Sequence, residues 1–322
     1  MNVPESLSAW DSQRPAIRQT LWRLLGDLPP IFTPDVQVTA RLERERYTIE
    51  KIAFDNGAGA VVFGYVLIPR GLQQTAPAVL YSHYHGGHFH LGKDEMFQDR
   101  VSVPPPGPVL VEAGFVVLAI DAYAFGERQT QGPAGGLESG RETEFALFKK
   151  FLWEGRTLWG MIVRDDLLAL NYLCTRPDVD SKRLAATGMS LGASRTTWVS
   201  ALDDRIALTI PVAQMTRYRD FADAGRMNGH SIYYYVPGAL VAGIDMEHLA
   251  SLVAPRAQII LIGDSDPLSP ASGVRTVEAF TRQVYALYGA ADRFQTVLYE
   301  GVDHTYTPAM FAAVMDGLRR FL

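Results

Sequence analysis

The chain of 322 residues contains a single cysteine, Cys174. One cysteine excludes an internal disulfide framework and gives no sign of an oxidising compartment. Because Cys174 lies on the apolar side of an expected helix, we expect it to be a buried small hydrophobic side chain. Blocks of like charge are also missing, since the net charge of -5 comes from interspersed acidic and basic residues. Nucleic acids and anionic membrane surfaces are therefore poor candidate partners.

Long apolar runs are absent too, because no stretch reaches the roughly 18 residues that a membrane-spanning helix needs. The N-terminal residues MNVPESLSAWDSQRP lack the basic start and the apolar core of a signal peptide. We therefore expect a cytoplasmic protein with no membrane partner. The composition, 48% hydrophobic and 20% charged, is typical of a globular protein without linkers or repeats. These features predict a single domain over residues 1–322, and they leave association into a homo-oligomer open.

The N-terminal part of the chain changes from helical to strand-like patterning. Apolar residues recur at helical spacing over residues 14–25, and a glycine followed by two prolines would end this helix, so residues 1–35 are predicted as a helical lead-in. Three strand-like runs follow at 36–43, 47–55 and 60–69, and the DNGAG stretch between the last two is typical of a hairpin turn. We expect these runs to be antiparallel strands.

From Pro77 onward, strands and helices alternate. Helices are expected at 158–176 and 307–322, and the Tyr-, Gly- and Arg-rich segment within 215–250 breaks the alternation like a cap-like insertion. The alternation predicts an α/β fold with a mostly parallel central sheet, antiparallel N-terminal strands and helices on both faces. The expected parallel strands are 78–83, 115–121, 183–190, 206–213, 257–264 and 294–300.

The pentapeptide GMSLG at 188–192 has the form G-x-S-x-G and lies between an expected buried strand and an expected helix. So tight a turn holds its serine in strained dihedrals, and the flanking glycines let neighbouring backbone approach closely. Ser190 would then lie at the carboxyl edge of the sheet, near the positive end of the following helix. We predict that Ser190 is a nucleophile; the alternative is a helix-capping serine in an ordinary turn.

A serine hydroxyl becomes an effective nucleophile when a histidine, itself oriented by a carboxylate, removes its proton. In this architecture the residues follow in the order Ser, acid, His, each after a strand. His304 follows the last expected strand and is the only histidine after His248, so we predict that it is the base; a capping or surface imidazole is the alternative. Two carboxylates, Asp264 and Asp266, follow one strand. We favour Asp266, because Asp264 can serve the turn itself.

Four of the seven histidines lie in HYHGGHFH, residues 83–90. Acyl transfer needs N–H donors directed at the oxyanion, one from the residue after the nucleophile and one from a loop after an early strand. The first is expected from Leu191. For the second we expect the amide of His85 or Tyr84, and the Tyr84 hydroxyl could assist.

A zinc site is the alternative interpretation of these histidines. HYHGGH nearly matches the H-x-H-x-D-H motif of metallo-β-lactamase-like hydrolases, but Gly87 stands in place of the aspartate ligand. No further histidine occurs between His90 and His230, and residues so close in sequence cannot all converge on one metal ion. We therefore expect no metal and no cofactor, with His88 and His90 as pocket-wall or surface residues.

Several of these motifs together resemble one known family. From about Ala78 to the C-terminus, the chain resembles the α/β-hydrolase superfamily and, within it, the dienelactone hydrolase and acetyl xylan esterase-like branch. The resemblance rests on HYHGGHFHLGKDE, DAYAFGER (121–128), PDVDSKRLAATGMSLG with ALDDRIA, LASLVAPRAQIILIGDSDPLSP, and GVDHTY.

The resemblance implies a nucleophile at Ser190, an acid at Asp266 and a general base at His304. It implies that residues 121–128 wall the active site, with Glu127 and Arg128 as structural or pocket residues, and we favour a loop salt bridge for that pair. The chain departs from the family where it has His83-Tyr84 in place of His-Gly.

These observations predict a serine hydrolase that cleaves carboxylic esters with acetyl or other short acyl groups, with carbohydrate esters among the candidate substrates. The substrate pocket is expected to be lined by residues 84–95, 121–130 and 217–240, and the three tyrosines in SIYYYVPG would be aromatic walls or packing residues. The alternatives are a peptidase, a thioesterase or a dienelactone-type hydrolase on the same fold, a zinc-dependent hydrolase, and a non-catalytic protein that has kept the fold.

Overall fold

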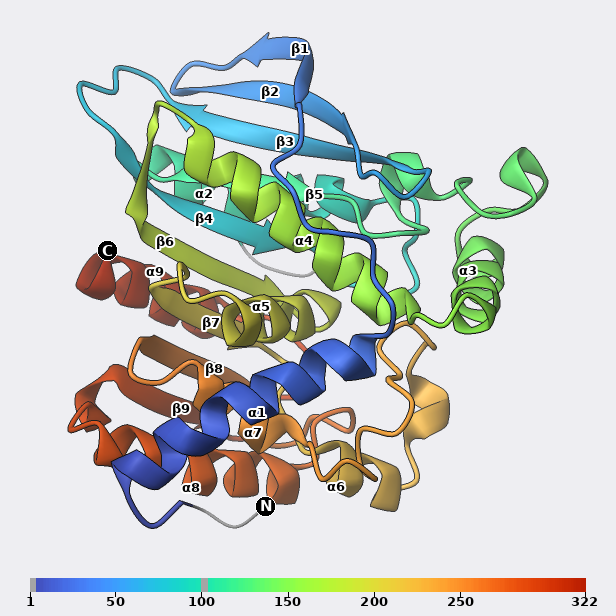
Figure 1. The fold of residues 1–322 in the computed structure, drawn as a ribbon. Coiled ribbons are helices and arrows are strands. Elements are labelled where there is room, and N and C mark those ends of the chain that lie inside the picture. The colour runs from blue at the N-terminus through green and yellow to red at the C-terminus, as the bar shows by residue number, and fades with distance from the viewer. Residues whose placement is uncertain (1–3, 100–103) are drawn as a thin grey trace.

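The computed structural model describes residues 4–99 and 104–322, so residues 1–3 of the expected lead-in lie outside the described residues (Figure 1). The strands are β1 (Gln37–Glu43), β2 (Tyr47–Asp55), β3 (Val61–Pro69), β4 (Ala76–Ser82), β5 (Val116–Ile120), β6 (Val179–Met189), β7 (Leu208–Val212), β8 (Ala257–Gly263) and β9 (Phe294–Tyr299). The α-helices are α1 (Leu7–Leu25), α2 (Pro106–Glu112), α3 (Arg141–Trp153), α4 (Leu158–Thr175), α5 (Leu191–Leu202), α6 (Tyr218–Asp223), α7 (Met246–Leu252), α8 (Ala271–Leu287) and α9 (Pro308–Phe321).

The nine strands form one sheet in the order β1-β2-β3-β5-β4-β6-β7-β8-β9. The pairs β1–β2, β2–β3 and β3–β5 are antiparallel, and the remaining five pairs are parallel. The expected strands are therefore present, and the predicted fold class, a mostly parallel sheet with antiparallel N-terminal strands, is confirmed.

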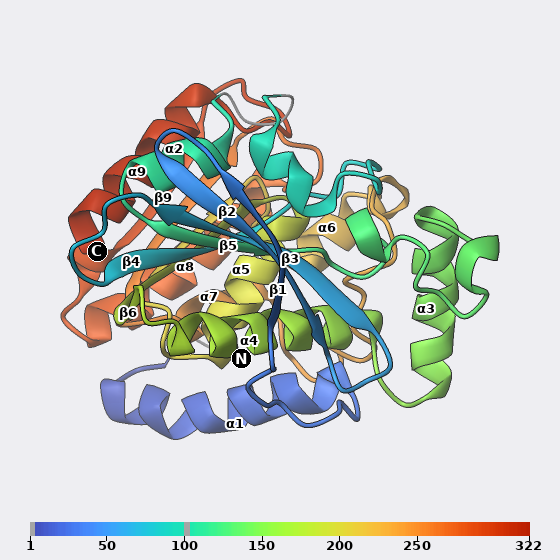
Figure 2. The same cartoon turned by 90° about the horizontal axis from the view of Figure 1, so that it is seen from above.

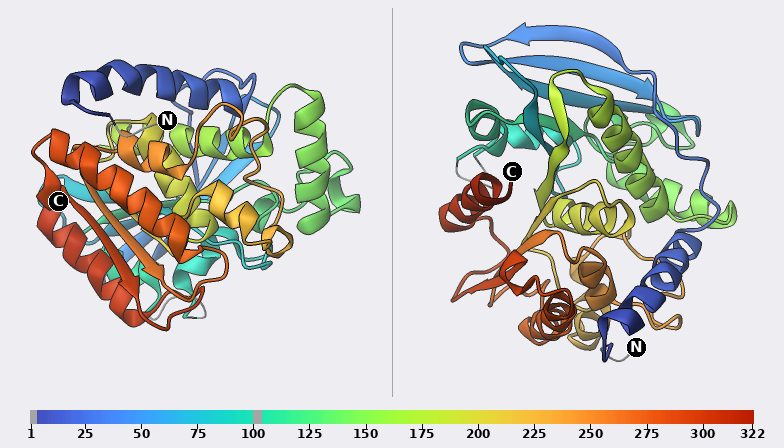
Figure 3. Two further views of the ribbon diagram at one scale, coloured as in Figure 1. Left: turned by 90° about the horizontal axis from the view of Figure 1, so that it is seen from below. Right: turned by 60° about the vertical axis from the view of Figure 1, so that its left-hand side comes forward.

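Helices cover both faces of this sheet, as Figures 2 and 3 show from above and below. Residues of α1, α4, α5, α7 and α8 share one hydrophobic core with side chains from one face of the sheet. Residues of α2 and α9 share a second core with side chains from the other face. Because the central strands are covered on both sides, all five residues of β5 and all seven of β8 are buried.

The helix ends follow from local chemistry. The side chain of Ser6 caps α1 by accepting from the Ala9 amide, and α1 ends at Gly26, whose φ of 97° favours glycine. The side chain of Thr157 caps α4 in the same way, accepting from the Gly160 amide. Cys174 near the end of α4 packs against the core but is only half-buried, so it is less buried than expected.

The site is positioned by the carboxyl ends of the parallel strands, which meet at one edge of the sheet. The loops after β4, β6, β8 and β9 carry the four groups of residues singled out from the sequence. The long connection from β7 to α7, which includes α6, supplies residues 228–233 to the cavity at this edge. Across residues 4–99 and 104–322, we find no helix with the length and apolar character required to traverse a lipid bilayer.

Candidate active site

Ser190 occupies the turn between β6 and α5 in a strained backbone conformation, with φ 57° and ψ -113°. Few non-glycine residues adopt a positive φ, and such strain persists only where the surroundings enforce it. The Ser190 amide donates to the Val212 carbonyl at 2.9 Å, and its carbonyl accepts from the Ser194 amide. These bonds hold the serine at the N-terminus of α5.

The two glycines of the G-x-S-x-G motif are required by close backbone contacts. A Cβ atom at Gly188 would lie 2.2 Å from the carbonyl oxygen of Ser82, and one at Gly192 would lie 2.0 Å from the same atom. Because Ser82 ends β4, the motif packs the nucleophile turn directly against the start of the histidine-rich loop.

The structure brings the three candidate triad residues together. His304 Nε2 lies 2.9 Å from Ser190 Oγ, and His304 Nδ1 lies 2.8 Å from Asp266 Oδ2. Asp266 is buried and also accepts from the Leu268 amide at 2.8 Å. A carboxylate on one ring nitrogen leaves the other nitrogen free to accept the serine proton.

Two backbone amides near Ser190 are candidate donors to an oxyanion, those of Leu191 and His85. Leu191 is the first residue of α5, so its N–H has no acceptor within the helix. In the histidine-rich loop, the Tyr84 backbone hydrogen-bonds to the Glu95 carboxylate, which engages that amide. The His85 amide remains as the second candidate donor, and His85 lines the same cavity as Ser190.

Glu95 itself is fully buried beneath this loop and also accepts from the Tyr81 hydroxyl, at 3.1 and 3.0 Å. Burial raises the pKa of Glu95 to about 8, against the opposing effect of the hydrogen bonds from Tyr81 and Tyr84. Glu95 therefore connects Tyr81 to the loop by hydrogen bonds, and its carboxyl group is neutral or charged depending on the pH.

The clustered histidines lie in different surroundings. His83 is buried, with Nδ1 2.8 Å from the Tyr84 carbonyl and Nε2 accepting from the Ala122 amide, and burial keeps its pKa well below the usual range. His88 lines a cavity and His90 is exposed. Over the described part of the chain, no three His, Cys, Asp or Glu side chains are arranged to hold a metal ion.

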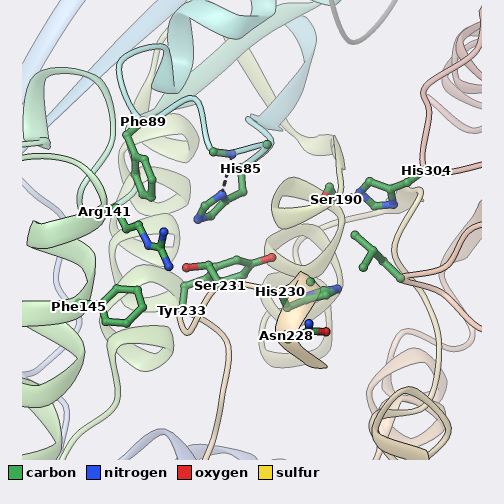
Figure 4. A pocket seen from close by; sticks show the side chains of 14 residues that line it. His85, Phe89, Arg141, Phe145, Ser190, Asn228, His230, Ser231, Tyr233 and His304 are labelled. Carbon is green, nitrogen blue, oxygen red and sulfur yellow. Dashed lines mark hydrogen bonds between the residues drawn. The ribbon is translucent and has the colours of Figure 1, made fainter. Parts of the chain in front are cut away.

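Two cavities meet at the Ser190–His304 pair. The larger, of about 400 Å³, is shown in Figure 4. The smaller, of about 290 Å³, lies beside Tyr84, His88, Met189 and Thr305. The larger cavity has aromatic and polar walls made of His85, Gly86, Gly87, Phe89, Arg141, Phe145, Asn228, Gly229, His230, Ser231, Tyr233 and Leu268.

The lining matches the sequence-based expectation only in part. Residues from the 84–95 and 217–240 segments line the larger cavity, but none from 121–130 does, so that expectation was wrong. The DAYAFGER loop is instead held by salt bridges to other parts of the protein. Arg128 is buried and donates to Asp165 at 2.8 Å, and Glu127 pairs with Lys93 at 2.7 Å. The two residues therefore form salt bridges with other partners rather than with each other.

Residues that the sequence did not single out complete the cavity. Arg141 and Phe145 come from α3, and no motif distinguishes that helix from any other amphipathic segment. His230 lies in the irregular 217–243 segment, with its Nε2 buried and without a hydrogen-bond partner among the described residues. Burial, and repulsion from His304, lower the pKa of His230 to about 4, so it is neutral at pH 7.

Comparison with known proteins places this arrangement in context. No family model matches the chain. A Bacillus subtilis (strain 168) protein named "Putative hydrolase YtaP" is 34% identical over 282 residues, which cover 87% of this chain and 90% of that protein. A 4-O-methyl-glucuronoyl methylesterase of Neurospora crassa is 25% identical over 232 residues, covering 63% of this chain and 58% of that protein. The crystal structure of a putative acetyl xylan esterase from Bacteroides fragilis matches with a TM-score of 0.77 at 19% identity, covering 100% of this chain and 90% of that one.

Proposed function

The chain belongs to the α/β-hydrolase superfamily, and we propose that it hydrolyses carboxylic esters with Ser190 as nucleophile, His304 as general base and Asp266 as the residue that orients the imidazole. The observation that carries this proposal is the continuous hydrogen-bonded chain Ser190 Oγ–His304–Asp266 at the mouth of a cavity. Its members come from three loops that are far apart in sequence.

In the first half of the reaction, His304 Nε2 takes the proton of Ser190 while Oγ forms a bond to the acyl carbon. The amides of Leu191 and His85 would donate to the oxyanion. When the tetrahedral intermediate collapses, the bond to the alcohol oxygen breaks and His304 returns the proton to that oxygen. An acyl group then remains on Ser190.

In the second half, His304 takes a proton from water as the water oxygen attacks the acyl carbon. Collapse of this second intermediate breaks the bond to Oγ, and His304 returns the proton to Ser190. The products are one carboxylic acid and one alcohol, so only water is consumed.

The cavity and the named relatives support a proposal on the substrate class. Two of the relatives are named as a putative acetyl xylan esterase and a 4-O-methyl-glucuronoyl methylesterase, and we propose esters of carbohydrates as the substrates. A cavity of about 400 Å³ with Phe89, Phe145 and Tyr233 beside polar groups suits a sugar ring. We further propose that the 215–250 segment is a cap-like wall of this site within one domain.

The test compares wild type with Ser190→Ala on acetylated xylosides, methyl glucuronate, a thioester and a peptide anilide, together with labelling by a fluorophosphonate probe. Wild type should hydrolyse the carbohydrate esters best and be labelled at Ser190, and the variant should lose both properties while keeping its circular dichroism spectrum. Turnover retained by the folded variant, or a peptide anilide as best substrate, would overturn the proposal.

A further inference from the structure

Helix α3 stands to one side of the sheet (Figures 1 and 2), and its N-terminal part reaches the larger cavity through Arg141 and Phe145. Between these two residues lies Glu144, which is 1% exposed. Within residues 4–99 and 104–322, no lysine or arginine lies within ion-pair distance of its carboxylate. A buried carboxylate lowers the stability of the fold unless hydrogen bonds satisfy it. The groups that donate to Glu144 therefore identify the segments that it connects.

The two oxygens of Glu144 bind two different loops. His85 Nε2 lies 3.0 Å from Oε1, and the Ser231 hydroxyl donates to Oε2. His85 belongs to the loop after β4, and Ser231 belongs to the connection between β7 and α7. One carboxylate therefore joins two walls of the cavity that lie well over a hundred residues apart in the sequence.

The other contacts of His85 fix its role as a donor to Glu144. Its Nδ1 accepts from the Gly87 amide at 3.1 Å, so in the neutral ring the proton lies on Nε2. The ring stacks on Tyr233 with centroids 5.1 Å apart, and its edges meet Phe89 and Phe125 at 4.9 and 5.0 Å. Both ring nitrogens are thus engaged, and the imidazole has one orientation.

We propose that Glu144 is a positioning residue: through its two oxygens it fixes the loop whose His85 amide donates to the oxyanion and, separately, the cavity wall that contains Ser231. This inference rests on the proposed ester hydrolysis. The carboxylate is buried and does not line either cavity at Ser190, so it acts through His85 and Ser231.

The expected size of the effect follows from what a misplaced donor costs. Removing one oxyanion donor costs roughly 10²- to 10³-fold in kcat, and a displacement of about 1 Å can cost about 10²-fold. Loss of the His85 bond should therefore lower kcat by roughly 10- to 100-fold. Loss of the Ser231 bond should change the fit of the substrate and leave the oxyanion donors in place.

The experiment uses Glu144→Met with Glu142→Met as its matched control, because Glu142 is exposed in the same helical turn. Methionine has a length similar to that of glutamate but no carboxylate oxygen, so the bonds to His85 and to Ser231 are both lost; glutamine would not serve, because its amide can accept from His85 and donate to the Ser231 hydroxyl. We expect Glu144→Met to lower kcat for an acetyl ester by 10- to 100-fold. Its affinity for a trifluoromethyl ketone, which mimics the tetrahedral intermediate, should fall in parallel. Glu142→Met should match wild type.

Ser231→Ala tests the bond to Ser231 alone and remains informative if the methionine variant folds poorly. We expect its KM for a carbohydrate ester to rise 3- to 10-fold with kcat within about twofold of wild type. A kcat for folded Glu144→Met within twofold of Glu142→Met would overturn the proposal, as would a loss of kcat without loss of ketone affinity. Wild type and Ser190→Ala are assayed alongside: ester turnover that depends on Ser190 upholds the proposed function whatever Glu144 does, and an inactive wild type overturns both.

Discussion

Asp264 and Asp266 lie two residues apart in the loop after β8 and bind different parts of the molecule. Asp266 Oδ2 lies 2.8 Å from His304 Nδ1, whereas Asp264 Oδ1 accepts from the Gly301 amide at 2.8 Å and from the Ser265 hydroxyl at 3.0 Å. Asp264 therefore joins the loop after β8 to the loop after β9, and Asp266 orients the imidazole that this junction brings near.

This division predicts opposite outcomes for two equivalent substitutions. Asp266→Asn removes the charge that stabilises the imidazolium and can bind the wrong ring tautomer, so kcat should fall by roughly 10³- to 10⁴-fold. Asp264→Asn keeps a carbonyl oxygen for the Gly301 amide, so kcat should stay within about threefold of wild type. Steady-state kinetics on one acetyl ester measures both. Equal losses in the two variants would mean that Asp266 is not the orienting acid.

The glycines of the nucleophile turn lead to a prediction about stability. A Cβ at position 192 would lie 2.0 Å from the Ser82 carbonyl oxygen and 3.0 Å from that of His83, and backbone atoms inside a sheet cannot move away cheaply. Gly192→Ala should lower the free energy of unfolding by about 2–4 kcal/mol. Gly136→Ala is the control, because nothing lies within 4 Å of its Cβ position. Urea denaturation should show it unchanged or slightly stabilised; equal behaviour of the two variants would contradict the close contact.

The sequence predicted much of the frame because local patterns encode it. Apolar runs of strand length and the glycines around Ser190 depend on neighbours in sequence, so the strands and the nucleophile turn could be expected. Ser190, His304 and Asp266 followed from the order of strands, and the structure brings them within hydrogen-bond distance. The pairing of Glu144 with His85 could not be expected, since a glutamate in a helix looks the same whether it faces solvent or a distant loop.

The walls of the cavity were harder to predict for a related reason. Residues 121–130 were expected there, but their buried Arg128 pairs with Asp165 on α4, which draws the loop into the protein and away from the cavity. α3 takes its place through Arg141 and Phe145. Which loop faces the substrate is decided by pairs of side chains from different elements, and no spacing within one segment reveals them.

Glu95 gives a prediction about pH. Burial raises its pKa to about 8, well above its value in the unfolded chain. Between these two values the folded state holds a proton that the unfolded state has lost. The free energy of unfolding therefore decreases as pH rises across this window, by on the order of 1 kcal/mol per pH unit for such a group.

Glu95→Gln removes this titration while keeping an acceptor for Tyr81 or the Tyr84 amide. We expect the variant to gain stability relative to wild type as pH rises from about 5 to 8, measured by urea denaturation at each pH. Glu142→Gln, at an exposed glutamate, is the control and should follow wild type. If the Glu95→Gln difference is independent of pH, the carboxyl group does not hold its proton in the folded protein.

His230 lines the cavity that contains Ser190, and its buried ring nitrogen lowers the stability of the fold. Its ring lies between Phe221 and Tyr234, with centroids 4.5 and 4.9 Å away, and its Nε2 is buried without a hydrogen-bond partner in the described part of the chain. It also lines the larger cavity with Ser190 and His304 (Figure 4). A buried nitrogen without a hydrogen-bond partner lowers the free energy of unfolding by about 1–3 kcal/mol. Because His230 carries this cost in the cavity wall, we expect it to contact the substrate.

His230→Phe should therefore raise the free energy of unfolding by about 1 kcal/mol at pH 7, because it keeps an aromatic ring between the same neighbours and removes the unpaired nitrogen. The gain should grow as pH falls from about 6.5 to 4. In that window the unfolded wild-type chain binds a proton at this histidine, and the folded chain, with its pKa lowered to about 4 by burial, does not.

A neutral imidazole pairs well with a hydroxyl group, which both donates and accepts. The same variant should lose about tenfold in kcat/KM for methyl glucuronate and keep its activity on methyl cyclohexanecarboxylate, which has no hydroxyl groups. Equal losses on the two esters would show that His230 shapes the cavity and does not recognise a hydroxyl group.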